Sequence, residues 1–472
     1  MVTIISRITK GHGQVVKGDV FIFPKGEKLT AEDLQGFLAY QRLLYDKRYK
    51  PNYNLYTSNH PILQDSEKAW SENNKLVVPM PRLLVDEYAG YFGGNAPTVQ
   101  LEDETDNDSL QAWLNNVEFA DEHSEIVKTV SIYGRSYLLA YQSEGAKPEI
   151  AHVEPDEGFM VYDDTVKCEP LAFVRYSWDE NGILEGTIYY ANEYVTFTDE
   201  TLEEAISYTW HDVPAIEFYS NEERQGIFDG VKTLIEALDN VMSRKANQVD
   251  YFDNAYMLAL GLNLEDEDGN IQIDRNQRLI YSPDADATSA KVGFIEKPDA
   301  DGMQENLINR LIDLIYYTSM IPNLQDSAFS GNSSGVALQF KLLPMQNMAA
   351  FQERKFIKSL RRMFKVLFES ADGGQIVRSI NKESWLDLRF TYTRNMPQNM
   401  ADAVSTAVQA SSLLSQQTAL AMIPGIDDPQ AEIKRKQDEQ NETVKNAFNS
   451  VPNTPDYLVG DSHDDTEESE EQ

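Results

Sequence analysis

The amino-acid sequence predicts an α+β fold, in which helices and β-hairpins occupy different stretches of the chain. Three observations predict it. Apolar residues follow helical spacing in 27–47 and 109–132, and short β-branched and aromatic runs separated by turns follow up to residue 198. Two long amphipathic helices, at 227–260 and 303–320, then enclose a polar insert. The 472 residues are enough for about three domains.

The N-terminal part of the chain is expected to hold three helices and then a meander of hairpins. Thr30 is a candidate N-cap for the first helix, and a loop carrying Pro51 and Pro61 follows that helix. The predicted helices lie within 27–47, 75–93 (after Pro81) and 109–132. The predicted strands are 136–142, 159–162, 171–178, 186–190 and 194–198.

The helix–insert–helix unit is the most informative piece of organisation. Residues 264–302 are polar and contain two or three short strand-like runs, and Pro322 ends the second helix. Such a unit indicates an antiparallel helix pair with a projecting tip, an element that can line a ring. An ordinary helical hairpin within a core remains the alternative.

The remaining chain is predicted to be mostly helical. Residues 323–335 are predicted to form a loop rich in glycine and serine. Residues 456–472 contain eight acidic residues and no lysine or arginine. This composition predicts disorder from Val451 onward. A helix at 336–370, a strand at 385–392 and helices at 400–423 and 429–448 are expected between these segments.

The composition excludes several classes of protein. The chain has 41 Lys and Arg against 77 Asp and Glu, a formal net charge of −36, so as a whole it repels DNA, and any contact with nucleic acid must be local. A single cysteine, Cys168, excludes an internal disulfide framework. We find no metal-ligand spacing, phosphate-binding loop, secretory signal or membrane-spanning stretch. We therefore expect a soluble protein made in the cytosol, with no cofactor and no metal.

Residues 331–335 match G-x-S-x-G, the nucleophile spacing of serine hydrolases, with Ser333 as the nucleophile. That chemistry needs a buried strand before the serine and a histidine after it. The preceding residues here are polar, and only His463 follows. A mobile loop between two helices is the favoured interpretation, and the hydrolase is kept as the enzyme alternative.

One basic segment stands out in this acidic chain. Arg354, Lys358, Arg361 and Lys365 share a helix face by their spacing. This face could contact DNA phosphates, or it could form salt bridges with acidic neighbours, some of them on another copy of the chain. We favour salt bridges, because exposed charged faces are common.

Several segments spread over about 350 residues together resemble a known family. They are LLVDEYAGYFGG (83–94), KTVSIYGRSYLLAYQ (128–142), FMVYDDT (159–165), EPLAFVRY (169–176), VPAIEFYSNEERQGIFDGVKTLIEALD (213–239), FSGNSSGVALQFKLLPMQ (329–346), YTRNMPQN (392–399), LLSQQTAL (413–420) and PGIDDPQAEIKRKQDE (424–439). In order and spacing the chain resembles the portal proteins of tailed phages that infect Gram-positive bacteria, of the siphophage type with a compact clip domain.

The resemblance implies a ring of twelve identical subunits at one vertex of the capsid, which forms a channel for double-stranded DNA. It implies as partners the terminase large subunit during packaging, the head–tail adaptor protein afterwards, and the major capsid and scaffold proteins. The location would be the virion, after assembly in the host cytoplasm, with no membrane contact and no enzyme activity. Another minor head or connector protein is the alternative, although adaptors are usually much smaller.

The resemblance also implies a division of the chain. The wing would comprise residues 1–225 and a second part, 336–399, which includes the long helix. The stem would comprise 226–260 and 303–320, with the clip, 261–302, between them. The tunnel loop would be 321–335, the crown 400–450 and the acidic tail 451–472. The DNA-facing loop residues would be Asn323, Gln325, Asp326, Ser327, Ser330, Asn332 and Ser333. The clip residues facing motor and adaptor would be Asp274, Arg275, Asn276, Gln277 and Arg278. The stem charges expected to pair between subunits are Glu236, Asp239, Arg244, Lys245 and Asp250.

Overall fold

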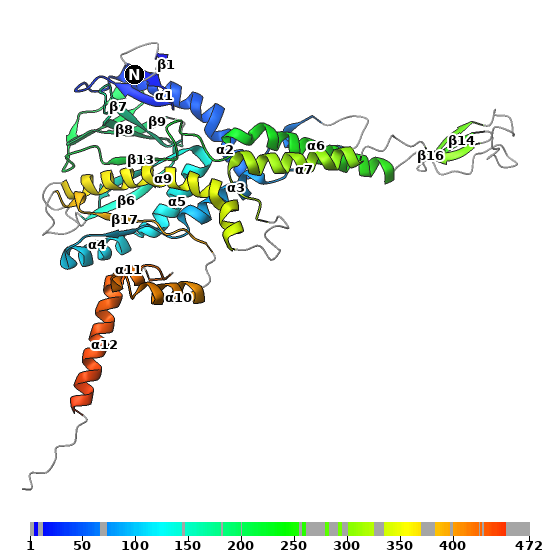
Figure 1. Cartoon of the computed structure of the whole chain (residues 1–472). Coiled ribbons are helices and arrows are strands. Elements are labelled where there is room, and N and C mark those ends of the chain that lie inside the picture. The colour runs from blue at the N-terminus through cyan, green and yellow to red at the C-terminus, as the bar shows by residue number, and fades with distance from the viewer. Residues whose placement is uncertain are drawn as a thin grey trace, which may run out of the picture. The chain divides into compact units, whose positions relative to one another are not determined.

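The protein is described by a computed structural model. The structure describes residues 4–7, 13–66, 73–143, 147–180, 183–199, 201–253, 257–260, 279–282, 291–294, 301–324, 335–369, 383–396, 400–423, 425–426 and 429–449. They divide into two compact units, Met1–Asn395 and Met396–Gln472. Helices and several separate sheets alternate along the chain, so the predicted α+β class is confirmed (Figure 1).

The largest sheet joins an N-terminal hairpin to the predicted meander. Its order is β1-β2-β3-β7-β8-β9-β10-β11, and β12 pairs with β10. Neighbours are antiparallel except β3 and β7, which run parallel. The meander strands are confirmed, whereas β1 to β3 were not predicted. The bounds are β1 (Ile4–Arg7), β2 (Gln14–Val16), β3 (Val20–Phe23), β7 (Gly158–Asp163), β8 (Pro170–Trp178), β9 (Leu184–Tyr189), β10 (Glu193–Thr198), β11 (Thr201–Leu202) and β12 (Ile206–Ser207).

The first helix, α1 (Ala31–Leu44), begins as predicted. The Thr30 hydroxyl accepts a hydrogen bond from the Asp33 N–H, and the Asp33 carboxylate accepts one from the Thr30 N–H, which completes a capping box. The predicted loop at 49–61 is wrong over its first half. A π-helical turn, Tyr45–Tyr49, leads directly into α2 (Lys50–Tyr56). Pro51 lies in the first turn of α2, directly after this π-helical turn.

The predicted helix at 109–132 is in fact two helices. α4 (Glu104–Asn116) and α5 (Phe119–Tyr133) are separated at Glu118, whose φ of 50° is left-handed and interrupts the helical path. α3 (Met80–Gly93), predicted after Pro81, packs on α5. The short 3₁₀ turns of this unit are Pro61–Gln64, Asp229–Val231 and Ser384–Leu386.

Two smaller sheets complete the core of the first unit. One has the order β13-β5-β6 and the other pairs β17 with β4. The long helix α9 (Gly335–Glu369) runs through Pro344 and lies against β13 (Figure 1). There the Ser359 hydroxyl donates to the Glu217 carbonyl at 2.6 Å. The bounds are β4 (Thr98–Gln100), β5 (Arg135–Gln142), β6 (Pro148–Val153), β13 (Ala215–Tyr219) and β17 (Arg389–Thr391).

The predicted helix pair is present, with one correction. α6 (Lys232–Asp253) and α7 (Asp301–Ser319) lie side by side (Figure 1). The first helix ends earlier than predicted, and Met257–Leu260 forms strand β14. This strand pairs in parallel with β15 (Leu279–Ser282) and antiparallel with β16 (Lys291–Phe294), as the strand-like runs of the insert suggested. A run of four apolar residues suits a helix or a strand equally, and here partner strands decide.

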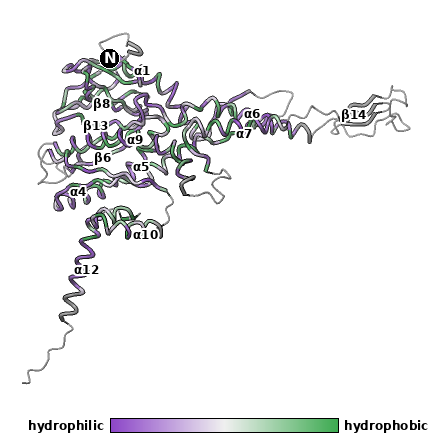
Figure 2. The backbone as a smooth tube through the Cα atoms, in the orientation of Figure 1, coloured by the Kyte–Doolittle hydropathy of each residue, from purple (hydrophilic) through white to green (hydrophobic). Residues whose placement is uncertain are grey.

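The second unit is helical. It contains α10 (Met400–Ala410), α11 (Gln416–Leu420) and α12 (Pro429–Asn449). The predicted continuous helix at 400–423 is interrupted before Ser415, whose hydroxyl caps α11 by accepting from the Thr418 N–H. α12 is confirmed and is largely hydrophilic along its described length (Figure 2). The predicted disordered tail at 451–472 lies outside the described residues.

Candidate functional site: a helix pair and a basic pocket

A polar stripe on α6 fastens the helix pair to the rest of its unit. Asp239, Ser243 and Asn247 are four residues apart and therefore share one face of the helix. Each accepts a hydrogen bond from a backbone N–H of the non-helical segment 73–79, which thus satisfies its backbone without a sheet partner. The bonds are Val78 N–H to Asp239 (2.8 Å), Leu76 N–H to Ser243 (2.9 Å) and Asn74 N–H to Asn247 (2.6 Å).

Asp239 is the most buried member of the stripe, at 1% exposed. Its second oxygen lies 2.5 Å from Nδ1 of the fully buried His60, and Nε2 of His60 lies 3.1 Å from the Leu55 carbonyl oxygen. Burying a carboxylate is unfavourable unless hydrogen bonds replace water, and here two partners do so. Asp239 therefore serves the internal structure of one chain.

Three of the five stem charges expected to pair between subunits are engaged within one chain, which corrects that prediction. Asp239 binds His60 as described, Lys245 forms an ion pair with Glu305 of α7, and Asp250 accepts from the Asn74 side chain. Periodicity could not distinguish them from the exposed Glu236 and Arg244, because their partners lie far away in the sequence.

The opposite kind of surface lies on α7. Met303, Leu307 and Tyr317 are 72%, 46% and 85% exposed, and with the half-buried Leu314 they follow one face of the helix. The exposed Arg310 lies on the same face, between Leu307 and Leu314. Exposed apolar side chains gathered on one helix face favour an interaction surface.

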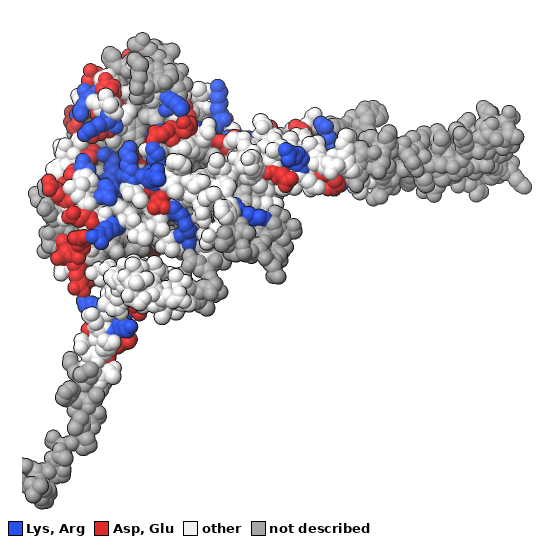
Figure 3. All heavy atoms as spheres, viewed as in Figure 1, with Lys and Arg blue, Asp and Glu red and all other residues white. Residues whose placement is uncertain are grey.

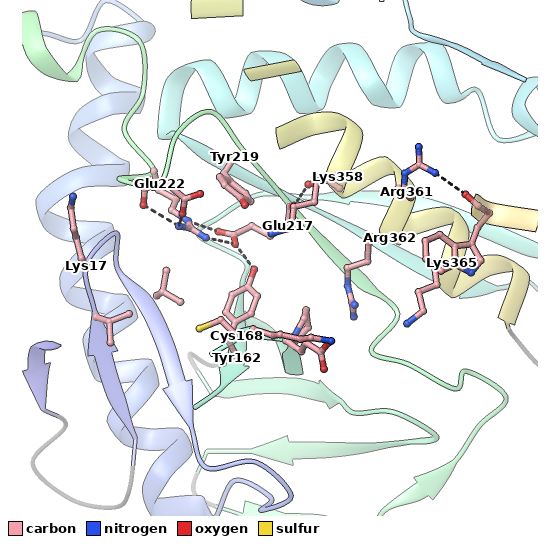
Figure 4. A pocket seen from close by; sticks show the side chains of 18 residues that line it. Lys17, Tyr162, Cys168, Glu217, Tyr219, Glu222, Lys358, Arg361, Arg362 and Lys365 are labelled. Carbon is pink, nitrogen blue, oxygen red and sulfur yellow. Dashed lines mark hydrogen bonds and ion pairs between the residues drawn. The ribbon is translucent and has the colours of Figure 1, made fainter. Parts of the chain in front are cut away.

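A cavity of about 740 Å³ opens between α9 and the large sheet (Figure 4). Its floor is formed by Val16, Val20 and Tyr162, which pack together. Trp385 lines the cavity beside α9, where its carbonyl oxygen accepts from Arg361. Arg362 and Lys365 extend from α9 towards the strand that carries Tyr162 (Figure 4). The cavity thus combines an apolar floor with a basic wall.

A buried charge network supports this floor. The Glu217 carboxylate accepts from Arg224 at 3.1 Å, lies 3.7 Å from Arg135, and accepts from the Tyr162 hydroxyl. Burial alone would raise the pKa of the Glu217 carboxyl, but the guanidinium groups of Arg224 and Arg135 hold it below its ordinary value. The network joins β13 to β5 and β7, so the strands beneath the cavity are fixed to one another.

Positive charge exceeds negative charge in the cavity lining. Seven Lys and Arg residues and three Glu residues line it, and the basic side chains gather on the face over α9 (Figure 3). Arg362 is paired with Asp212 at 2.9 Å, whereas Lys365 lies farther from the same carboxylate, at 3.8 Å. Among the described residues, Lys358 forms no ion pair, and Arg361 donates to the carbonyls of Trp385 and Leu386 instead of to a carboxylate.

The structure separates the predicted basic face into two parts. Lys358, Arg361 and Lys365 line the cavity, whereas Arg354 lies 5.6 Å from the ring centre of Phe351. Arg362 was missed, because helical spacing alone does not show that the strands of the floor approach α9 on that side. What these side chains bind remains a prediction.

Most of the predicted tunnel-loop and clip residues lie outside the part of the chain that the structure describes. Asn323 is half-buried, just after α7. The other predicted loop residues (Gln325, Asp326, Ser327, Ser330, Asn332 and Ser333) and the clip residues Asp274 to Arg278 lie outside the described residues. Their roles stay predictions.

One serine–histidine contact deserves comparison with a hydrolase site. Ser136 Oγ lies 2.8 Å from Nε2 of His152 across β5 and β6. Ser136 is fully buried, so no substrate can reach its hydroxyl. Within the described ranges, no group of three or more His, Cys, Asp or Glu side chains could hold a metal ion. None of the described helices is both long and apolar enough to cross a lipid bilayer.

Two curated portal proteins and one solved structure are among the known proteins that this chain matches. The portal protein of Bacillus phage SPP1 is 24% identical over 405 residues, which cover 78% of this chain and 77% of that protein. The portal protein of Clostridium phage phiCD119 is 22% identical over 419 residues, covering 82% and 90%. Among solved structures, a chain from the neck of an empty GTA particle, computed with C6 symmetry, matches with a TM-score of 0.38 and 11% identity, covering 73% of this chain and 90% of that one.

The model of the family described as phage portal protein, SPP1 Gp6-like, matches residues 36–446. That range includes the helix pair, α9 and most of the pocket, and it extends through α12 almost to its end. The resemblance found in the sequence is therefore confirmed, and the chain belongs to the SPP1 Gp6-like family of phage portal proteins.

Proposed function

We propose that twelve copies of this chain form a ring at one vertex of a phage capsid, and that double-stranded DNA passes through the ring. The observation that carries the proposal is the family match over residues 36–446. The exposed apolar stripe of α7 supports it, because a ring of identical chains needs surfaces that are left uncovered in one chain.

The proposed channel function agrees with the charge of the chain. A net charge of −36 repels DNA phosphates, so DNA would slide where a basic bore would hold it. In this proposal Asn323, Ser330 and Ser333 belong to a loop that touches the moving backbone through small polar side chains without reading bases. The same role is proposed for Gln325, Asp326, Ser327 and Asn332.

The remaining parts of the proposal concern partners. The terminase large subunit would dock on the clip around Asp274 to Arg278 during packaging, and the head–tail adaptor would replace it. The ring would assemble in the host cytoplasm with the major capsid and scaffold proteins and would itself hydrolyse nothing. The motor would supply the energy of ATP hydrolysis.

The decisive experiment is the mass and shape of the purified protein, by light scattering and then negative-stain electron microscopy. We expect rings of about twelve copies with a central hole, in keeping with closed cyclic symmetry. A monomer that also failed to enter capsid shells formed with scaffold and coat protein would contradict the proposal.

The loop assignment has its own test. In assembled particles, Ser333→Lys together with Asn332→Lys adds positive charge at the proposed DNA path and should slow packaging in vitro, while Ser333→Ala should leave both assembly and packaging intact. Equal packaging by the lysine variant would contradict the loop assignment. An esterase activity abolished by Ser333→Ala would instead support the hydrolase alternative.

A further inference from the structure

The cavity between α9 and the large sheet has the size of a ligand site. Its volume of about 740 Å³ lies within the range of known ligand-binding cavities and is much larger than one phosphate ion needs. Every residue that lines it belongs to the first compact unit, Met1–Asn395. The site is therefore complete within that unit.

The floor of the cavity offers apolar contact and few free polar groups. Val16 and Val20 pack against the ring of Tyr162. The Tyr162 hydroxyl donates to the Glu217 carboxylate, and Arg224 donates to the same carboxylate at 3.1 Å. Because these polar atoms are already paired, a nucleobase or a sugar placed on the floor would leave its own hydrogen-bonding groups unsatisfied. The part of a ligand that rests here should therefore be apolar.

The wall from α9 carries two cations that remain available to a ligand. Lys358 is exposed and forms no ion pair within the described ranges. Lys365 lies 3.8 Å from Asp212 and 3.9 Å from Glu369, beyond good hydrogen-bond distance. Arg362, by contrast, is paired with Asp212 at 2.9 Å. A partly enclosed recess strengthens the attraction between the two lysines and an anion, because less water screens it.

The two lysines indicate how the anionic groups of the ligand are spaced. Lys358 and Lys365 are two helical turns apart, so their Cα atoms are about 10 Å from each other along α9. In an extended peptide, acidic residues two positions apart project on one side, about 7 Å from each other, and the residue between them projects on the other side. An acidic–apolar–acidic sequence would thus present two carboxylates to the wall and one apolar side chain to the floor.

We propose that this cavity binds an extended acidic–apolar–acidic segment of a partner protein. Its carboxylates pair with Lys358 and Lys365, and the apolar side chain between them rests against Tyr162 (Figure 4). In a chain of net charge −36, this basic recess attracts an acidic segment that most of the surface repels. Duplex DNA is the weaker candidate, because its phosphates would contact the wall but would leave the apolar floor unused.

Binding of a synthetic peptide to the purified full-length chain tests the inference. The probe is a short fluorescein-labelled peptide in which glutamate and leucine alternate, and fluorescence anisotropy measures its affinity. Alternating glutamate and serine removes the apolar contact, whereas alternating lysine and leucine reverses the charge. We expect the glutamate–leucine peptide to bind at least about tenfold more tightly than either matched peptide, the scale of burying one leucine side chain.

Cys168 reports whether the peptide occupies this cavity. It lines the cavity and is the only cysteine of the chain, so its alkylation is measured by mass spectrometry without background. Burial raises the pKa of the Cys168 thiol, so alkylation is carried out at alkaline pH, where more thiolate forms. Saturating glutamate–leucine peptide should slow the alkylation by about tenfold or more, and inorganic pyrophosphate should not.

Matched variants test the contribution of the wall. Lys358→Glu with Lys365→Glu should weaken binding of the glutamate–leucine peptide at least about tenfold, the expected scale for losing two charge contacts. Lys47 and Lys147 are exposed and lie outside the cavity lining. Lys47→Glu with Lys147→Glu changes the net charge equally and should weaken binding by at most about twofold at physiological ionic strength. Thermal unfolding of each variant confirms that it is folded.

Three results would overturn the inference. One is the absence of glutamate–leucine peptide binding to the folded chain. Another is an affinity that does not respond to charge reversal at Lys358 and Lys365. The third is displacement of the probe by pyrophosphate or by a short DNA duplex as readily as by unlabelled peptide, which would assign the cavity to phosphates. Ring formation is not required for these measurements, so the inference can fail while the proposed channel function holds, and the reverse.

Discussion

Two glycines determine how the turn at 221–226 meets the N-terminal hairpin and the end of α5. Gly134 has a φ of 84°, and a Cβ there would lie 1.9 Å from the carbonyl oxygen of Arg224. Gly18, with a φ of 82°, would place a Cβ 2.4 Å from the carbonyl oxygen of Glu222. The backbones can approach this closely only without side chains, and the approach brings Arg224 to the buried Glu217.

We predict that Gly134→Ala lowers the free energy of unfolding by more than about 2 kcal/mol, because strain in the left-handed region and a backbone clash act together. Gly26→Ala is the matched control. Gly26 has a φ of 83° but nothing within 4 Å of its added Cβ, so only backbone strain of about 1 kcal/mol is expected. Chemical denaturation measures both, and equal losses would refute the clash.

A second prediction at this scale concerns pH. Burial raises the pKa of Glu87 to about 7, and one of its carboxylate oxygens has no hydrogen-bond partner among the described residues. The folded chain therefore keeps this proton to higher pH than the unfolded chain does. The contribution of this bound proton to the free energy of unfolding is fully present below the unfolded pKa of about 4.5. It is lost as the pH rises through the folded pKa of about 7.

Glu87→Gln should consequently stabilise the chain at pH 8, by about 1 kcal/mol once partial exposure is allowed for, and should change little at pH 4.5. Thermal unfolding at the two pH values measures the difference. The exposed Glu204→Gln should show no such pH dependence of its effect. Stabilisation of Glu87→Gln at pH 4.5 equal to that at pH 8 would rule out titration as the cause.

At the scale of elements, the position of α6 depends on its polar stripe as well as on its apolar face. The apolar side chains Ile235 and Leu238 are fully buried, as periodicity predicts. Asp239, Ser243 and Asn247 add a second contact by capping the backbone of 73–79. Because a helix can slide along an apolar contact more easily than along directed hydrogen bonds, the stripe sets the register of α6.

Asp239→Ala should lower the free energy of unfolding by about 2–3 kcal/mol, because it leaves the buried His60 and the Val78 N–H without their acceptor. It should also speed hydrogen exchange of the Val78 amide. Glu236 is exposed and lies one turn earlier. Glu236→Ala should change the free energy of unfolding by no more than about 0.5 kcal/mol, and it should leave hydrogen exchange of the Val78 amide nearly unchanged. Unchanged exchange at Val78 in Asp239→Ala would refute the anchoring role.

The helix boundaries show where local pattern stops being informative. The apolar period continues from α4 to α5, but Glu118 adopts a left-handed conformation and ends the first helix. Likewise the apolar run at 257–260 becomes a strand because β15 and β16 lie beside it. At 257–260 the partner strands choose between conformations that the local residues allow.

At the scale of the whole molecule, the exposed stripe on α7 is expected to be buried between neighbouring copies. Met303→Ser with Leu307→Ser should therefore reduce the proposed ring to smaller species by light scattering, without lowering the thermal stability of the single chain. Asn306→Ser with Asn309→Ser, on the exposed side of the same helix, is the matched control and should assemble normally. Normal rings from the first variant would show that the stripe lies outside the interface.

The sequence by itself determined the α+β class, the cap at Thr30, the meander strands, the helix pair and membership of the portal family. These features rest on periodic burial and on residue types that act within a few positions, so they can be read along the chain. The tertiary structure decided the parallel pairing of β3 with β7, the internal use of Asp239, and the cavity that brings Val16, Tyr162 and Lys358 together. These contacts join residues that are far apart in the sequence. They form because the packed core as a whole has the lowest free energy with them, and no short segment carries that information.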